Sequence, residues 1–323
     1  LLSLVGSEMC IRDRGECGPD EAHLPGESGC ALVGPVCPTG DYADDLPTDR
    51  TIVYVLAGAS SGGDGSFTAP YASLEDAAAA SMSGDVIAVG KGTYEACVDS
   101  GASREYWGAC VAETVVSCSS ESETLGTIGT TETGVRIRNM TIGGNRPGVS
   151  AHGGATVDLQ NVVVLDAGSV GITVGPSSTL TGHDVVVRGT RPDSTGRLGT
   201  GIQVVSGGML DLSRTAVVDN TGAGVLAGYT GTSVTLTDSV IRDTQPRPDD
   251  DDGFGVDAGM GPSVTLERVV IWQNHKSGVV AHDDLTTVSL TDCVVSDTQP
   301  RQTNLSQGVG VNAHVDAAVT LER

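Results

Sequence analysis

A run of four aspartates, Asp249, Asp250, Asp251 and Asp252, is the densest cluster of ionisable side chains in the sequence. Asp257 follows shortly after, and period-two alternation places its side chain outward. Ca²⁺ is a hard cation that takes roughly six to eight oxygen ligands, so these five carboxylates are candidate metal ligands. Their spacing matches no standard calcium loop, and the alternative is a solvated acidic loop.

Two arginines accompany these carboxylates. Arg247 lies two residues before the acidic run, and Arg301 lies 54 residues further along at the matching place of a repeat. Side chains that exchange protons with a substrate must lie within reach of one another and of the substrate. Arg247 and Arg301 neighbour the acidic loop, and with Asp257 they form a crude acid/base set whose catalytic roles are implied only by the family resemblance given below.

The spacing of the arginines belongs to an internal repeat. The segment Thr237–Arg247 returns as Thr291–Arg301, 54 residues later. A fixed period of this kind indicates a solenoid, in which each unit packs on its neighbours. The architecture can therefore be predicted from the repeat, whereas the function cannot.

Each coil of this solenoid contains short strands. A five-residue pattern recurs in which the first residue is apolar, the third is usually Leu or Ile and the fifth is polar. It begins at Val135, Val157, Leu180, Leu210, Val234, Val264, Val288 and Val319. A second strand opens on a glycine followed by Val or Ile, at Gly148, Gly171, Gly201, Gly224, Gly255, Gly278 and Gly310. A Val-rich stretch between them completes roughly three strands per coil. The sequence thus predicts an all-β parallel β-helix, with coils about 4.8 Å apart.

Long and short coils alternate along the chain. The extra residues of the long coils precede the second strand, at Thr190–Arg197, Thr244–Asp252 and Thr298–Ser306. Because they recur in every second coil, we expect the three loops to line one edge about 10 Å apart. Side chains from all three could then touch one extended ligand.

Three histidines share one outward column, His152, His282 and His314. The last two fall in adjacent coils, where their side chains could approach one another. A transition metal would want a third ligand, for which Asp283 or Asp316 is available. The alternative is that these histidines are ordinary surface side chains.

An N-terminal module precedes the repeats. It runs through Val53–Val55, Asp64–Ser66 and Pro70–Leu74, then an alanine-rich stretch, then Gly84–Val89 and Gly92–Tyr94. With the coils that follow, it resembles the right-handed parallel β-helix proteins of the pectate-lyase-like superfamily, particularly the bacterial secreted type. The resemblance covers roughly residues 51–323 and implies a right-handed β-helix.

A short helix is expected within this module. Ser73 and Asp76 have capping-box spacing, and good helix formers follow them. Such a helix would cover the exposed strand edges of the first coil.

The resemblance also implies two chemistries. Lyases of this superfamily combine acidic calcium ligands with a basic residue that removes a proton beside a uronate carboxylate, and its hydrolases use paired aspartates with His, Arg and Lys nearby. The hydrolase motifs do not occur here in order, because Asp283 follows His282 without the expected Asn-x-Asp before it. Fold does not imply function, so we expect a non-catalytic protein.

The first 50 residues differ in character from the rest. Residues 1–14 resemble sequencing-adapter read-through, with a signal-peptide remnant as the alternative. Residues 15–50 carry Cys17, Cys30 and Cys37 among Pro, Gly and acidic residues, which predicts a disulfide-tied or disordered linker. The β-helix domain occupies residues 51–323, and we expect it to continue beyond the last residue, since the eighth coil stops midway.

Composition narrows the location and the partners. Seven cysteines remain after Cys10 is set aside, and they indicate an oxidising, extracytoplasmic compartment. No Cys-x-x-Cys or close Cys/His spacing supports zinc. The formal net charge of −23 repels nucleic-acid phosphates and anionic membranes. The chain has no apolar run of roughly 18 residues, so we expect no transmembrane segment.

These observations favour a secreted or cell-surface β-helix with a structural or adhesive role, whose partner is an extracellular glycan or another cell-surface molecule. The alternative is a polysaccharide lyase or glycoside hydrolase that acts on an acidic glycan, with Ca²⁺ as a candidate cofactor. Oligomeric state does not follow from the sequence.

Overall fold

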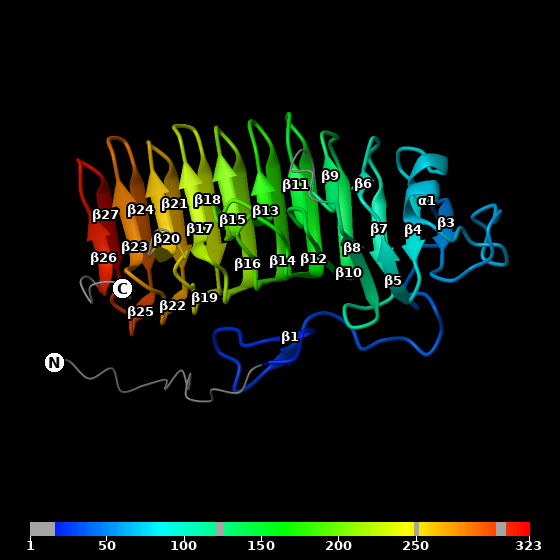
Figure 1. Cartoon of the computed structure of the whole chain (residues 1–323), viewed down its shortest axis with the longest axis horizontal. Coiled ribbons are helices and arrows are strands. Elements are labelled where there is room, and N and C mark those ends of the chain that lie inside the picture. The colour runs from blue at the N-terminus through cyan, green and yellow to red at the C-terminus, as the bar shows by residue number, and fades with distance from the viewer. Residues whose placement is uncertain (1–16, 121–125, 249–251, 302–307) are drawn as a thin grey trace.

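A computed structural model describes residues 17–120, 126–248, 252–301 and 308–323. The strands stack side by side along one long axis as a parallel β-helix (Figure 1). Parallel pairing holds throughout the 16-stranded and 9-stranded sheets, and the antiparallel pair is β1 (Glu21–Ala22) with β2 (Ala31–Leu32). The expected all-β solenoid is confirmed.

The first strand of each coil belongs to the 16-stranded sheet. From residue 135 onward these first strands are β10 (Val135–Gly144), β12 (Thr156–Leu165), β14 (Thr179–Arg188), β16 (Met209–Val218), β18 (Ser233–Thr237), β21 (Ser263–Glu267), β24 (Thr287–Thr291) and β27 (Ala318–Glu322). The register stacks the eight predicted strand starts, from Val135 to Val319, one over the next. The sequence pattern therefore reports the register correctly.

The Val-rich stretch that follows the first predicted strand is continuous with that strand in some coils, which the sequence did not indicate. In β10, β12, β14 and β16 one ten-residue strand runs through both stretches, whereas β19 (Val240–Arg242), β22 (Val270–Trp272) and β25 (Val294–Ser296) are separate. One residue per coil makes the bend in the left-handed region, with φ of 49–55° at Asn139, Asn161, Asp184, Arg214, Asp238, Arg268 and Asp292. Asn and Asp tolerate this conformation better than most residues.

The nine-stranded sheet forms the last side of each coil. It contains β6 (Val98–Asp99), β9 (Ile128–Thr130), β11 (Val149–Ala151), β13 (Val170–Val174), β15 (Thr200–Val205), β17 (Gly222–Gly228), β20 (Gly253–Gly259), β23 (Ser277–His282) and β26 (Val309–Ala313). The glycines that the sequence places at the start of these strands lie where successive coils approach closely, with the exception of Gly310. A Cβ at Gly255 would lie 2.4 Å from the carbonyl oxygen of Gly278.

The interior is a stack of Val, Ile, Leu and Ala, into which buried polar side chains are set, among them Asn220 and Asn274. Asn274 lies in a short coil and is fully buried. Its Oδ1 accepts from the backbone N–H of Thr244 at 3.0 Å, and its Nδ2 donates to the carbonyl of Ile241 at 3.0 Å. Asn220 does the same for Thr190 and Val187. Each short coil thus fixes the start of a long-coil loop.

A short helix closes the N-terminal end of the stack, as expected. Helix α1 (Leu74–Ala80) begins at Ser73, whose Oγ accepts from the N–H of Asp76 at 3.0 Å. Its Leu74 and Ala77 are fully buried in the core. The first coils beside it contain β3 (Ile52–Val55), β4 (Val86–Val89), β5 (Gly92–Glu95), β7 (Glu105–Gly108) and β8 (Thr114–Cys118).

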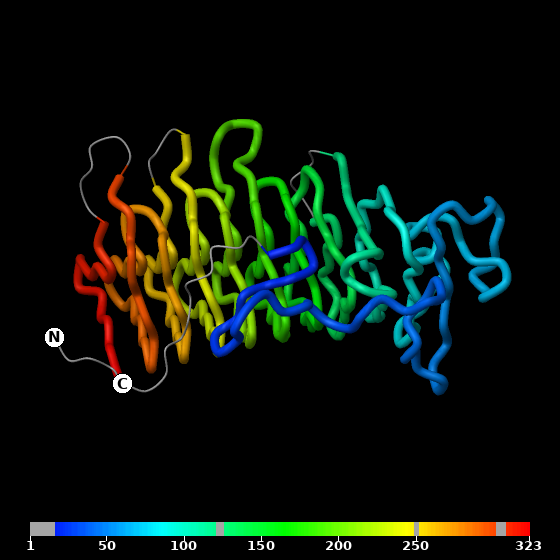
Figure 2. The backbone as a smooth tube through the Cα atoms, turned by 90° about the horizontal axis from the view of Figure 1, so that it is seen from below, coloured from blue at the N-terminus to red at the C-terminus, as the bar shows by residue number. Residues whose placement is uncertain are grey.

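Residues 17–37 form a segment that we call the strap, which lies along the outside of the coils (Figure 2). Its buried Leu24 and Val33 pack in one cluster with Val163 and Val186, which face outward from the β-helix. The guanidinium of Arg188 donates to the carbonyl oxygens of Cys17, Gly18 and Glu21 at 2.9–3.2 Å. The strap has too few apolar residues for a core of its own, and it uses the solenoid's outer face instead.

Three disulfides secure the N-terminal half. They join Cys17 to Cys30, Cys37 to Cys110 and Cys97 to Cys118. Cys293 is outside these pairs. Of the seven cysteines from Cys17 onward, Cys293 is therefore the one left over from the pairing.

Replacing Asn274 with Ala should destabilise the stack, because it leaves the buried N–H of Thr244 without the acceptor that the Asn274 side chain supplies. Each buried unsatisfied group costs about 1–3 kcal/mol. We expect a clearly lower urea midpoint, measured by circular dichroism. Asn312→Ala, at a less buried position in β26, is the control and should leave the midpoint nearly unchanged. Equal midpoints for both variants would contradict a stabilising role of the Asn274 hydrogen bonds.

Candidate functional site

The described parts of the long-coil insertions lie along one edge of the β-helix (Figure 2). Bridges between coils set their register: Gly168 pairs with Arg191, Thr221 with Gln245 and His275 with Gln299. Within the first insertion Pro192 pairs antiparallel with Leu198, so this loop turns back on itself. The described parts of the three loops therefore form a row along this edge, separated by short coils, and we call this row the ridge.

One ion-paired group dominates the described part of the ridge. The Oδ2 of Asp252 lies 2.8 Å from an Nη of Arg247, and its Oδ1 contacts the Nζ of Lys276 from the next coil. The Lys276 ammonium also lies 4.5 Å from the ring centroid of Phe254. The side chains of Asp252 and Lys276 are only 12% and 15% exposed. This carboxylate is enclosed by two cations of its own chain.

The other predicted ridge residues are placed as follows. Asp249, Asp250 and Asp251 lie outside the described residues. Arg301 is half-buried in the third loop, and its Nε has no hydrogen-bond partner within the described ranges. The proposed calcium ligands therefore stay a prediction. Of the five carboxylates, Asp252 forms ion pairs with Arg247 and Lys276.

Asp257 points outward from β20, but its surroundings are poorly solvated. Leu226 and Val280 flank it on the neighbouring strands, and its side chain is 22% exposed. Its Oδ1 lies 3.1 Å from Nε2 of His282. The imidazole lies over Gly259, where a Cβ would come within 2.0 Å of the ring. A glycine at this position therefore gives His282 access to Asp257.

Burial raises the pKa of Asp257 above its ordinary value, and the neighbouring His282 opposes that shift. Asp252 raises this pKa further and Lys276 lowers it, both to a smaller degree. A carboxyl group with a raised pKa beside an imidazole is an arrangement that can exchange protons.

His282 has further neighbours. Its Nδ1 lies 2.8 Å from Oδ2 of Asp283, and its ring stacks on His314 with centroids 5.7 Å apart and planes 13° apart. The expected approach of these two histidines is thus observed. His152, in the same column, instead lies against Gly175, and burial lowers the pKa of its imidazole.

The sequence placed Asp257 and His282 outward separately but did not connect them. The connecting signal is the register, since Gly259 pairs with His282 and Asp257 stands two residues before Gly259. The absence of a side chain at Gly259 could have indicated that the ring leans toward Asp257.

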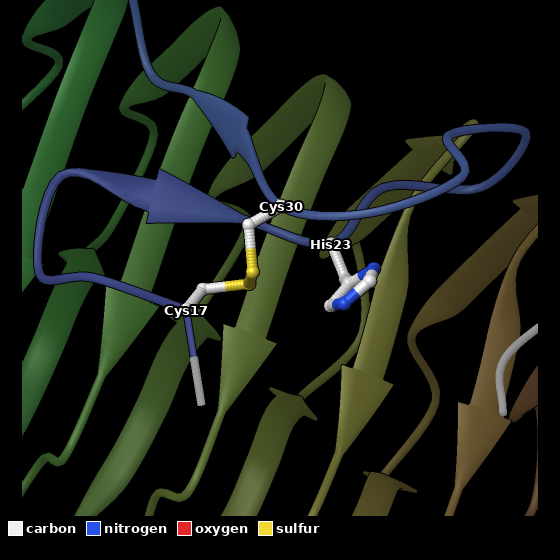
Figure 3. A group of neighbouring side chains, drawn as sticks. All are labelled: Cys17, His23 and Cys30. Carbon is white, nitrogen blue, oxygen red and sulfur yellow. A yellow bond between two sulfur atoms is a disulfide. The ribbon is translucent and has the colours of Figure 1, made fainter. Parts of the chain in front are cut away.

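Two further groups contain residues that commonly bind metals. The ligand atoms of Cys17, His23 and Cys30 lie within 4.8 Å of one another (Figure 3), as do those of Cys37, Cys110 and Glu113. In both groups the two sulfurs form a disulfide, which leaves one other ligand in each. A disulfide is not the thiolate form that binds metals.

The C-terminal half of the chain is similar to a known family of β-helix proteins. Residues 170–322 match the family model described as a right handed beta helix region. This match confirms the right-handed parallel β-helix that the resemblance implied. None of the curated proteins matches the sequence.

Solved structures of similar shape include three carbohydrate-active enzymes. Pectate lyase Pel9A is 13% identical, with a TM-score of 0.48 over 88% of this chain and 80% of that one. An alginate lyase from Paenibacillus sp. str. FPU-7 is 15% identical, with a TM-score of 0.49 over 77% and 94%. A GH136 lacto-N-biosidase from Eubacterium ramulus is 12% identical, with a TM-score of 0.35 over 84% and 68%. Identities this low say nothing about the chemistry of the ridge.

Replacing His282 with Ala should raise the pKa of Asp257 further, since it removes the group that most opposes the effect of burial. Gly259→Ala should also raise the pKa of Asp257, because the new methyl group displaces the His282 ring. His314→Ala should change this pKa less. NMR titration of the Asp257 carboxyl measures these shifts. An unchanged value in both His282→Ala and Gly259→Ala would contradict the contact.

The same shift has a consequence for stability. Because the folded-state pKa of Asp257 lies above the unfolded value of 3.8, the folded chain binds this proton more tightly. Its contribution to stability is present below the unfolded pKa and is lost as pH rises through the folded pKa. Asp257→Asn removes this titrating group, so the variant should lack the part of the decrease in stability that Asp257 causes as pH rises. Urea midpoints of the variant and the unchanged protein, measured across the acidic range, test this.

Proposed function

We propose that this chain is a non-catalytic, secreted or cell-surface β-helix whose ridge binds an extended extracellular glycan. The observation that carries the proposal is the enclosure of Asp252 between Arg247 and Lys276. These groups bind one another and make a rigid, polar surface. They do not stand free around a place where a substrate bond could be broken.

The candidate catalytic residues support this interpretation. A general base or acid must reach the reacting proton with a nitrogen or oxygen that is available to it. Arg247 is instead bound to Asp252, and Asp257 is bound to His282. A surface that is already hydrogen-bonded internally is pre-organised for binding, because few side chains must be ordered when a partner arrives.

The disulfides support the location. The N-terminal half contains three disulfides among its described residues. Disulfides form and persist in oxidising compartments such as the extracellular space. Among the described residues, no helix is long and apolar enough to cross a membrane.

The ridge fits an elongated partner. Its loops recur every second coil, so equivalent groups repeat at about 10 Å along a straight edge. A polymer with a regular repeat could contact several loops at once. Once one loop has bound, the effective concentration of the polymer at the next loop is high, so several weak contacts give a stronger total affinity. The net charge of −23 argues against nucleic acid as that polymer.

One observation favours a second candidate, a polysaccharide lyase or glycoside hydrolase. Asp257 combines a raised pKa with a histidine at 3.1 Å, which are properties that a general acid requires. In that case Asp257 and His282 would exchange the proton, and Arg247 or Arg301 would hold an acidic sugar.

A single set of assays distinguishes the two candidates. The full chain is incubated with polygalacturonate, alginate and neutral glycans, and product release is followed beside binding by affinity electrophoresis. We expect retardation by at least one glycan without product. Arg301→Ala should weaken retardation, whereas Arg214→Ala, on a different face, should not. Product release that disappears in Asp257→Ala would overturn the non-catalytic proposal.

The role of Ca²⁺ is tested with the same protein. Since Asp252 is already paired with two cations, we expect glycan retardation to be the same in Ca²⁺ and in chelator. Titration calorimetry that detects Ca²⁺ binding, together with its loss in Asp252→Asn, would instead support the five carboxylates as ligands.

A further inference from the structure

The Cys17–Cys30 disulfide differs from the other two in its exposure. Each disulfide has one buried cysteine, which is Cys17, Cys110 or Cys118. The partner of Cys17, Cys30, is exposed to solvent, whereas the other two partners, Cys37 and Cys97, are half-buried. Thiol–disulfide exchange requires a thiolate to reach one sulfur of the bond. An external thiol can therefore approach the disulfide of the strap more readily than either of the others.

A histidine stands next to this disulfide. His23 lies in the loop that the cross-link closes, and its ring lies beside the disulfide (Figure 3). Its nearest ring nitrogen and both sulfurs lie within 4.8 Å of one another. A protonated imidazole beside sulfur stabilises a thiolate and can deliver a proton to it.

We propose that Cys17–Cys30 is a thiol–disulfide exchange site that accepts a dithiol reductant, with His23 as the proton donor to the leaving sulfur. The inference does not depend on whether the ridge binds a glycan.

The chemistry balances without a metal or another cofactor. A thiolate of the dithiol attacks Sγ of Cys30 and forms a mixed disulfide, and the bonding pair of the old S–S bond leaves on Sγ of Cys17, which takes a proton from His23. The second thiol of the reductant then attacks its own sulfur in the mixed disulfide and releases Cys30. Two electrons pass from the dithiol, which becomes a disulfide, to the protein, which gains two thiols.

Reduction would change the surface of the molecule. The disulfide closes the loop that joins β1 to β2, and this loop carries Leu24 onto the outward valines Val163 and Val186. Without the cross-link the strap keeps its contacts with Arg188 and the Cys37–Cys110 anchor, but its loop gains freedom. We expect the apolar outer face to become accessible while the β-helix stays folded.

The test is the rate at which each disulfide opens. The full chain is treated with limiting dithiothreitol, quenched by alkylation and analysed by peptide mass mapping. We expect Cys17–Cys30 to open about tenfold faster than the other two. In His23→Ala that bond should open several-fold more slowly, and added imidazole should restore the rate. His314→Ala is the control and should match the unchanged protein.

Three results would overturn the proposal: similar opening rates for all three disulfides, no change in His23→Ala, or a slowed variant that imidazole does not rescue. Rescue distinguishes proton donation from a merely structural role of the ring. Dye binding to apolar surface, measured in parallel, should rise once Cys17–Cys30 is reduced and should stay low in a sample in which the strap remains oxidised.

Discussion

Backbone hydrogen bonding between successive coils is the interaction on which the whole molecule depends. It stacks each residue over its equivalent in the next coil, so a property of one column is repeated along the axis. Gly255 shows how tightly this constrains the sequence, because the carbonyl of Gly278 occupies the space of its missing Cβ. The buried asparagines Asn220 and Asn274 extend the constraint to the ridge by holding the start of each long-coil loop.

The same stacking determines which side chains can form a site. Lys276 reaches Asp252 because their coils are adjacent, and His282 reaches Asp257 because Gly259 has no side chain between them. Both arrangements pair acidic with basic groups inside the chain. This internal pairing distinguishes the surface from one on which a reactive group stands free, and it is consistent with a scaffold that presents a fixed pattern of charge.

Sequence reasoning succeeded where the repeat carries the information. The strand starts from Val135 to Val319 follow from period-two alternation, and the register confirms them. The helix at Leu74–Ala80 follows from its cap. Reasoning failed where contacts are lateral or distant: the approach of His282 to Asp257 requires the register of two strands, and the packing of Leu24 on Val163 joins segments far apart in sequence. Such contacts leave no local periodic signal.

The central claim is that the loops of the ridge stand in a fixed coil-to-coil register. Pairs of engineered cysteines test it in a Cys293→Ser background. His275→Cys with Gln299→Cys occupies bridged positions, within the Cα separation of roughly 4.4–6.8 Å that a disulfide requires, and should cross-link under mild oxidation. Gln245→Cys with Gln299→Cys spans two coils, about 10 Å, and should not. Cross-linking of the second pair with none in the first would contradict the account.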